Sequence, residues 1–311
     1  MSDKHVVVGA GAVGRAVAEQ LAARQAEVVL VSRSGTGPAV PGARREAADV
    51  SDGDRLTALA EGAVAIYNCV NPPSYDVWST SWPPVATAFL AAAERTGAVL
   101  AITGTLYPYG PVDGPMVEGM TDAATGTKGA LRARMWADAL AAHEAGRLAA
   151  FEVRGADYLG PGIGANGSHV AVVAPRALAG RSVRMFGRVD VAHSMTDVRD
   201  VARTLVAVVD RPGAQGRVWH APTNEARSQS ETVRDVCRSV GRAPVAVRPW
   251  PRAMLGVGGL VVPFLREMRE TVHQFESSYV IDSSAAEREL GLAPTPWDEV
   301  CRATAASALA G

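Results

Sequence analysis

The chain alternates between short apolar runs and longer segments in which apolar residues recur with helical spacing. The first run, at 6–8, is followed by Val13, Val17 and Leu21, which recur every four residues as on one helix face. A second β-branched run at 28–31 closes a strand–helix–strand unit. Further apolar runs recur at helix-sized intervals, at 63–70, 98–103, 149–154 and 216–222. This alternation predicts an α/β fold with a doubly wound parallel sheet.

A glycine-rich turn connects the first predicted strand to the first predicted helix. The stretch GAGAVG places Gly9, Gly11 and Gly14 in the spacing GxGxxG. Inside a strand–helix–strand unit of about 30 residues, this spacing is typical of dinucleotide binding. Glycines let the backbone approach a pyrophosphate, and the helix N-terminus offers free N–H groups. We therefore predict that these glycines, with Ala12 and Val13, bind a dinucleotide.

The end of the second predicted strand indicates which dinucleotide. An NAD site usually has an acid there to hold the ribose 2′-hydroxyl. This strand ends in Ser32, Arg33 and Ser34, and no acid follows before Glu46. A guanidinium between two hydroxyls suits a 2′-phosphate, so we predict NADP, with a solvated loop arginine as the alternative. Asp49, after a weak third strand, either faces the adenine or caps a helix.

Composition narrows the class of protein. A chain of 311 residues, 48% of them hydrophobic, can form one large domain or two unequal ones. The formal net charge is −1 with interspersed signs, so we expect neither nucleic acid nor a membrane as partner. Cys69, Cys237 and Cys301 are far apart and odd in number, which predicts no disulfide, no metal site and a cytoplasmic setting. The longest apolar run, 253–265, is too short to span a membrane and is expected to form a buried helix and turn.

Nearly the whole length resembles the extended short-chain dehydrogenases, the NAD-dependent epimerase/dehydratase group. Besides the glycine turn, the likeness rests on five segments: YNCVNPP (67–73), ITGTLYPYGP (102–111), RGADYLGPG (154–162), HSMTDVRDVARTL (193–205) and IDSSAAERELGLAPTPWDEVCRAT (281–304). The resemblance implies that Asn68, Val70, Thr103 and Tyr158 contact the cofactor. It also implies a homodimer as one possible assembly.

The resemblance also implies a division of the chain into two lobes. The first is an NADP-binding Rossmann domain at 1–162, to which 191–225 and about 276–285 return. The second is a smaller, discontinuous substrate lobe made of 163–190 and 226–275, and a C-terminal helix is expected at 286–311. Arginines of the substrate lobe either receive a substrate phosphate or form a solvated helix face; they include Arg248, Arg252, Arg266 and Arg269.

The family's catalytic groups are a Ser or Thr and a Tyr-x-x-x-Lys pair. Thr105 lies four residues before Tyr109 and takes the Ser/Thr place. Lys128 is one of two lysines against 29 arginines and takes the lysine place, where arginine is a poor substitute for a compact ammonium under a ribose. Four residues before it stands Ala124, which cannot transfer a proton. The usual tyrosine is therefore absent by this reading.

An acid–base group must then come from elsewhere, or the usual carbonyl chemistry is absent. Tyr107, Tyr109, Tyr158 and His193 are the candidates. We expect an NADP-dependent oxidoreductase or epimerase/dehydratase-like enzyme that acts on a small carbonyl or hydroxyl compound. The alternative is a non-catalytic NADP(H)-binding sensor of the nitrogen-metabolite-regulator type. A third reading is an enzyme that uses its cofactor only transiently or structurally.

Overall fold

The computed structural model describes residues 2–164, 167–251 and 270–310. A parallel sheet of seven strands forms its centre; the strands are β1 Lys4–Val8, β2 Glu27–Ser32, β3 Ala43–Ala47, β4 Ala63–Asn68, β5 Val99–Thr103, β6 Ala150–Arg154 and β11 Val218–His220. Their order across the sheet is β11-β6-β5-β4-β1-β2-β3, with every neighbouring pair parallel. The order runs outward in both directions from β1, which confirms the doubly wound Rossmann sheet.

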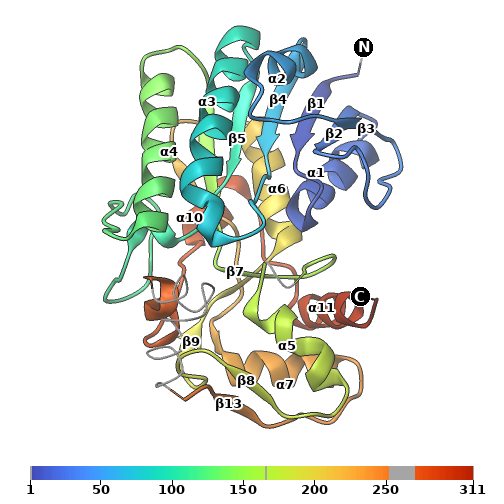
Figure 1. Ribbon diagram of the computed structural model, residues 1–311, viewed down its shortest axis with the longest axis vertical. Coiled ribbons are helices and arrows are strands. Elements are labelled where there is room, and N and C mark those ends of the chain that lie inside the picture. The colour runs from blue at the N-terminus through green and yellow to red at the C-terminus, as the bar shows by residue number, and fades with distance from the viewer. Residues whose placement is uncertain (1, 165–166, 252–269, 311) are drawn as a thin grey trace.

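Helices cover both faces of this sheet (Figure 1). One face packs against α1 Ala12–Ala23 and α6 Val198–Val209, and the other against α2 Gly53–Ala60, α3 Trp78–Thr96 and α4 Thr127–Glu144. The apolar runs of the strands make this possible because successive side chains point to opposite faces. Val7 lies in the core beneath α1 and α6, whereas Val6 and Val8 lie in the core beneath the other three helices.

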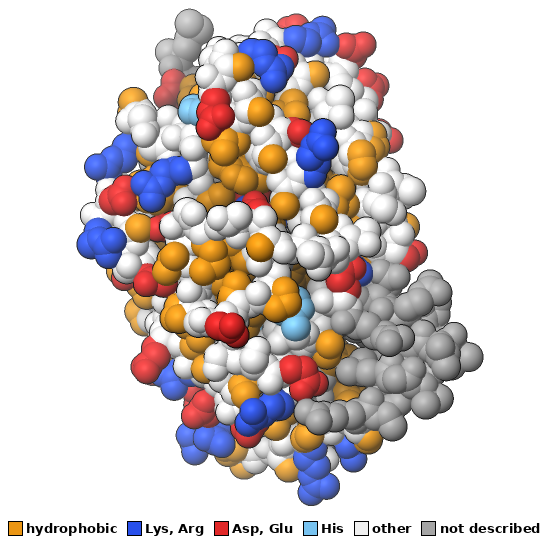
Figure 2. All heavy atoms as spheres, turned by 90° about the vertical axis from the view of Figure 1, so that its left-hand side faces the viewer, with side chains coloured by type: hydrophobic (Ala, Val, Ile, Leu, Met, Phe, Trp, Pro, Cys, Tyr) orange, Lys and Arg blue, Asp and Glu red, His pale blue; other side chains and the backbone are white. Residues whose placement is uncertain are grey.

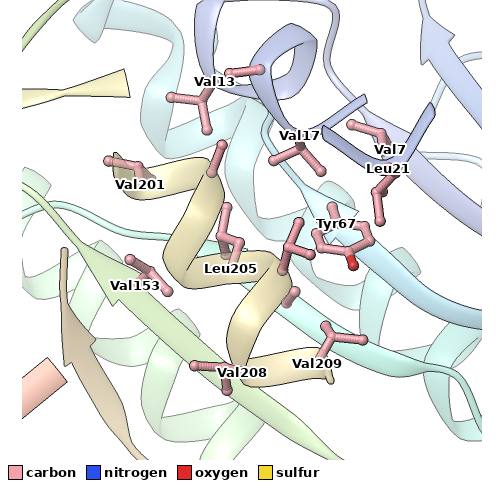
Figure 3. Packing of buried hydrophobic residues seen from close by; sticks show 14 of the residues in the cluster. Val7, Val13, Val17, Leu21, Tyr67, Val153, Val201, Leu205, Val208 and Val209 are labelled. Atoms are coloured by element: carbon pink, nitrogen blue, oxygen red, sulfur yellow. The ribbon is translucent and has the colours of Figure 1, made fainter. Parts of the chain in front are cut away.

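The predicted helix face of α1 is buried as expected. Val13, Val17 and Leu21 pack against α6 residues such as Val201 and Leu205 (Figure 3). Each of these five side chains is at most 9% exposed. The interface between α1 and α6 therefore fixes where the N-terminus of α1 lies relative to the sheet.

A second, smaller core lies below the sheet in Figure 1. Its elements are α5 His169–Leu178, β8 Val183–Met185, α7 Gln229–Ser239, β13 Val247–Pro249 and α11 Trp297–Ala310. Short strand pairs join the two parts: β7 Asp157–Leu159 with β10 Met195–Asp197, and β9 Ala192–His193 with β12 Arg227–Ser228. The predicted lobe limits stay a prediction.

The C-terminal segment forms two helices where the sequence predicted one. The first, α10 Ser284–Leu290, packs against α6 and β11, and α11 packs against α5 and α7. Gly291 ends α10 in the left-handed conformation, with a φ of 67°. Prolines at 294 and 296 then separate the helices, because proline cannot continue a helical hydrogen-bond ladder.

Several sequence predictions concern surface chemistry or fall outside the described residues. The apolar run at 253–265 and Arg252, Arg266 and Arg269 lie outside them, and Arg248 is an exposed residue of β13. No helix in the described ranges is long and apolar enough to cross a membrane. Acidic and basic side chains are interspersed on the face shown in Figure 2.

Candidate functional site

A cavity of about 610 Å³ lies at the C-terminal ends of the central strands. This is where open α/β sheets bind ligands, next to the point at which the strand order reverses. Its wall combines the start of α1 with loops after β4, β5 and β6 and with parts of the smaller core; the segments are Gly11–Val13, Cys69–Asp76, Thr103–Tyr107, Gly155–Tyr158, Gly162–Gly164 and Gly167–His169, with Trp78, Trp82, Arg132, Val172, Gln274 and Tyr279.

The glycine turn is shaped for a ligand that approaches the backbone. Gly9 has a φ of +107°, and an added methyl carbon there would lie 2.4 Å from the Cys69 carbonyl oxygen. A methyl carbon at Gly14 would lie 1.8 Å from the Gly9 oxygen, whereas one at Gly11 would meet nothing within 4 Å. Gly11 caps α1 without a side-chain bond. The free N–H groups of this helix start can therefore receive a pyrophosphate, so the residues present fit a dinucleotide.

The serines and arginine predicted to select NADP lie beside this turn. Gly9 N–H donates to the Val31 carbonyl at 2.8 Å, which joins the turn to the end of β2. Arg33 and Ser34 are exposed there. The Ser32 hydroxyl donates to the carbonyl of residue 36 at 3.3 Å, so the loop folds back on itself. These side chains lie outside the wall of the 610 Å³ cavity, on the β2 side of the turn.

Asp49 is exposed near the same arginine. Its carboxylate accepts bonds from the Ser51 N–H at 3.0 Å and the Ser51 hydroxyl at 2.7 Å. These bonds, and to a smaller extent the charge of Arg33, lower the pKa of Asp49. The alternative that Asp49 caps a helix is wrong, because Asp52 caps α2 by accepting from two backbone N–H groups.

The end of β4 shapes the middle of the cavity. The Asn68 side chain is buried and accepts a bond from the Val70 N–H at 3.2 Å, which fixes the following turn. The Thr103 hydroxyl lies 3.6 Å from the Cys69 sulfur. Burial raises the pKa of the Cys69 thiol to about 12, so this cysteine is a neutral packing residue rather than a nucleophile.

Thr105 and Tyr158 both line the cavity, but of their two hydroxyls only that of Tyr158 has a hydrogen-bond partner among the described residues. The Tyr158 hydroxyl donates to the Gly104 carbonyl at 2.9 Å, and burial raises the pKa of this phenol. The Thr105 hydroxyl is buried and has no hydrogen-bond partner within the described ranges. A buried hydroxyl without a partner costs free energy, so a ligand that bonds to it gains affinity.

Arg132 is a wall residue that the sequence analysis missed. It lies on α4, is almost fully buried, and donates to the Thr103 carbonyl at 2.5 Å. Its guanidinium lies 4.7 Å from the centre of the Trp82 ring and 3.7 Å from the Glu152 carboxylate. The Nε atom of Arg132 has no partner among the described residues. The signal was present in the sequence, because Arg132 follows Lys128 at the four-residue spacing of the family's catalytic pair.

Lys128 itself is buried at the start of α4 and is not part of the cavity wall. Its Nζ lies 3.2 Å from the Glu270 carboxylate and 5.2 Å from the centre of the Tyr75 ring. Ala124 precedes α4, and its N–H donates to the Pro108 carbonyl at 2.9 Å. Lys128 and Arg132 are thus four residues apart at the start of α4, the spacing of the family's Tyr-x-x-x-Lys pair. Of these two residues, Arg132 lines the cavity and Lys128 does not.

Tyr109 lies away from the cavity, in a buried polar network. Its hydroxyl bonds to His220 Nε2 at 2.8 Å, and its ring stacks 4.6 Å from the Arg154 guanidinium. Burial raises the pKa of Tyr109 to about 12 and lowers the pKa of His220 to about 4. A neutral imidazole that accepts the phenol proton is consistent with both shifts.

His193 lies behind the cavity wall, on β9. Its Nε2 is 3.3 Å from the carboxylate of Asp157, a wall residue, and its Nδ1 is 3.1 Å from the Gln274 carbonyl. The imidazole stacks on Phe275 and Tyr279, with ring centres 5.0 and 5.2 Å apart. His193 thus contacts the wall residue Asp157 but does not itself line the cavity. No group of His, Cys, Asp and Glu that could hold a metal occurs in the part of the chain that the structure describes.

Comparison with known proteins agrees with this fold. The sequence model of the NAD dependent epimerase/dehydratase family matches residues 5–221, more than half of the chain. The chain belongs to this family. No curated protein matches it in sequence.

Solved structures of similar fold include several epimerases. UDP-glucose 4-epimerase from Thermotoga maritima, solved with UDP-glucose, is 16% identical, with a TM-score of 0.77 and 98% of each chain covered. MoeE5, solved with UDP-glucuronic acid and NAD, is 20% identical, with a TM-score of 0.79 and 99% of each chain covered. The UDP-glucose 4-epimerase of Thermus thermophilus, solved in complex with NAD, is 19% identical, with a TM-score of 0.76, covering 98% of this chain and 99% of that one.

Family membership assigns the protein to a class of enzymes that use a nicotinamide dinucleotide. It favours an enzyme over the sensor that the sequence left as an alternative. The glycine turn and the cavity beside it are the parts of this chain that fit such a cofactor.

Proposed function

We propose that this protein is an NADP(H)-dependent oxidoreductase or epimerase/dehydratase-type enzyme that acts on a small carbonyl or hydroxyl compound. One observation carries the proposal. The Thr105 hydroxyl and the Arg132 Nε–H are buried polar groups without partners among the described residues, and both residues line the cavity that begins at Gly11–Val13. Two such groups in one wall suit a ligand with several hydroxyls.

The residues that would hold the cofactor follow the cavity from the glycine turn toward α4. Gly9, Gly11 and Gly14 with the start of α1 would receive the pyrophosphate, and Arg33 with its flanking serines the 2′-phosphate. Asp49, Asn68 and Val70 would border the nucleotide. When bound, the nicotinamide supplies or accepts a hydride, and the protein's part is to orient it.

Arg132 would take the task that the family resemblance gives to a lysine. Its guanidinium is held by Thr103, Glu152 and Trp82, and its Nε–H, which has no partner among the described residues, would donate to a ribose hydroxyl. Lys128 is engaged by the Glu270 carboxylate at 3.2 Å. Arginine is a planar donor that loses little freedom when it is stacked on an aromatic ring, which suits this enclosed place.

The rest of the wall suits a small polar substrate. Tyr75, Tyr107, Tyr279 and Trp78 are among its residues, so phenols and an indole are available near a substrate. The printed ligands of the solved epimerases are UDP-sugars, and a hydroxyl-rich compound of this kind is one member of the class proposed for this cavity. A homodimer and a cytoplasmic setting remain predictions from the sequence.

Titration calorimetry with NADPH and NADH tests the proposal. We expect both to bind, NADPH more tightly, and Thr105→Val with Arg132→Met to weaken both. A wild-type protein that binds neither cofactor contradicts the proposed function. A protein that binds NADH as tightly as NADPH contradicts only the choice of NADP.

A further inference from the structure

Two tyrosine hydroxyls meet in the wall of the cavity. Tyr75 lies in the 3₁₀ turn η1 Tyr75–Val77 after β4, and Tyr107 in the turn η2 Tyr107–Tyr109 after β5. Their hydroxyl oxygens are 2.7 Å apart, and both residues line the cavity. Tyr107 follows Thr105 by two residues, so the unpartnered threonine hydroxyl and the tyrosine pair belong to one short segment of wall.

Aromatic packing holds the pair in place. The Trp78 ring centre lies 5.1 Å from that of Tyr75 and 6.2 Å from that of Tyr107. The Lys128 ammonium lies over the Tyr75 ring at 5.2 Å. Such ring–ring and cation–ring contacts restrict both phenols, so their hydroxyls stay close without a covalent link.

The geometry leaves one proton of the pair available. Two hydroxyls can place only one hydrogen between their oxygens, so one phenol donates to the other and the second keeps its own proton for another acceptor. Burial raises the pKa of both phenols. They therefore remain protonated near neutral pH, as donors of hydrogen bonds.

We propose that Tyr107, backed by Tyr75 and beside Thr105, is the catalytic residue that binds the reacting oxygen of a carbonyl or hydroxyl substrate and exchanges its proton. The proposal rests on the proposed function. It assigns the acid–base task of the family tyrosine to a residue on a different element, the turn after β5. Tyr75 is the positioning residue, because it contacts Tyr107 and completes the relay.

The proton balance of a reduction follows directly. The carbonyl carbon gains the hydride that a bound nicotinamide would supply, the π-electron pair of the C=O bond moves to oxygen, and that oxygen takes the Tyr107 proton. Tyr107 then takes the Tyr75 proton, and Tyr75 takes one from water. One hydride and one proton are consumed for each alcohol formed, and oxidation runs through the same groups in reverse.

The experiment uses p-nitrophenol, whose phenolate oxygen imitates the developing alkoxide and whose flat ring suits the aromatic wall. Its absorbance reports the ionised fraction, so a pH titration in the presence of protein gives the affinity for phenol and for phenolate without turnover. We expect the wild type to prefer the phenolate. Tyr107→Phe should weaken phenolate binding by about ten- to hundredfold, as for a hydrogen bond to a charged group, and Tyr75→Phe should have a smaller effect.

Tyr109→Phe is the matched control, since it removes a phenol of the same turn that is bonded to His220 and is not part of the wall. This variant should bind the phenolate as the wild type does. Unchanged phenolate binding in Tyr107→Phe, or no phenolate preference in the wild type, overturns the proposal. NADPH affinity measured on the same variants distinguishes failure of the proposed function from failure of the Tyr107 assignment. A wild type that does not bind NADPH contradicts the proposed function. Tyr107→Phe should still bind NADPH.

Discussion

Arg132 and Glu152 form an ion pair inside the protein, with 3.7 Å between a guanidinium nitrogen and a carboxylate oxygen, and neither side chain is more than 3% exposed. The other carboxylate oxygen accepts a bond from Arg154 Nε at 2.7 Å. Gly104 provides the space, because a methyl carbon there would lie 2.7 Å from the carboxylate. Gly104, just after β5, and Glu152 and Arg154, both on β6, thus hold the Arg132 guanidinium of α4 at the cavity wall.

Removing Glu152 should destabilise the fold strongly. Glu152→Ala leaves Arg132 and Arg154 without their shared carboxylate in the interior, and a buried charge that loses its partner typically costs about 3–5 kcal/mol. The free energy of unfolding, measured by urea denaturation, should fall by that amount. Glu46→Ala is the control, because it removes a partly exposed partner of Arg44 and Arg55 and should cost about 1 kcal/mol or less. Similar losses in the two variants would count against this reading.

Two glycines of the first turn should respond differently to the same substitution. Gly14→Ala puts a methyl carbon 1.8 Å from the Gly9 oxygen, so the unfolding free energy should fall by about 1–3 kcal/mol as in an overpacked core. Gly11→Ala meets no protein atom within 4 Å and should cost under ~1 kcal/mol. Its methyl group would occupy the space proposed for the pyrophosphate, so NADPH affinity should fall nevertheless. Denaturation and calorimetry on both variants check this, and a Gly11→Ala protein with normal affinity speaks against the turn as a pyrophosphate site.

The fold could be predicted because its signals are local. Alternate residues of a strand point to opposite faces of the sheet, so Val7 lies in one core and Val6 and Val8 in the other. The GxGxxG spacing fixes the start of α1. The register of α4 was misjudged, although the four-residue spacing between Lys128 and Arg132 is visible in the sequence. That helix begins where Gly129 packs against the Tyr107 carbonyl, where a methyl carbon would lie 2.6 Å from the oxygen. A match by residue type alone assigns the family's lysine place to Lys128. The packing of α4 instead puts Arg132 on the cavity wall.

The Tyr75–Tyr107 pair also lacked a sequence signal. The two residues come from separate loops, 32 positions apart. Loops carry no periodic pattern from which contact between two side chains can be inferred. Tyr107 was one of several candidates because it follows a strand. Tyr75 was not among them.

His220 should make the protein acid-sensitive. Burial lowers its pKa from an ordinary 6.5 to about 4, so the unfolded chain binds the proton more readily. Stability from the neutral imidazole is complete above about pH 6.5 and is lost as the pH falls toward 4, by on the order of 3 kcal/mol. Burial raises the pKa of Glu118 to about 7 and that of Asp200 to about 6, and these acids act in the opposite direction.

Comparison with His220→Gln therefore isolates the histidine. The difference in unfolding free energy between wild type and variant should shrink from pH 7 to pH 4.5, by urea denaturation at each pH. A difference that stays constant over this range would show that His220 does not titrate as described.

Arg33 should set the preference between cofactors. Arg33→Ala removes the guanidinium expected to bind the 2′-phosphate, and a hydrogen bond to a charged group contributes about 1.5–3 kcal/mol. NADPH affinity should fall roughly ten- to hundredfold while NADH affinity stays the same, as measured by calorimetry. Arg45→Ala is a suitable control, since Arg45 is an exposed arginine of β3 that donates to the Gly37 carbonyl. Equal losses for both cofactors in Arg33→Ala would remove the basis for NADP selection.

The most direct test of the cofactor site compares NADPH affinity in Arg132→Met and Lys128→Met. Both substitutions replace a buried cation of α4 with an apolar side chain of similar length, so loss of charge alone does not separate them. If Arg132 holds the nicotinamide ribose, its variant should bind NADPH about ten- to hundredfold more weakly, and Lys128→Met should lose far less. Melting temperatures of both variants check that the fold is kept. The opposite order, with Lys128→Met losing the cofactor and Arg132→Met keeping it, would contradict the assignment.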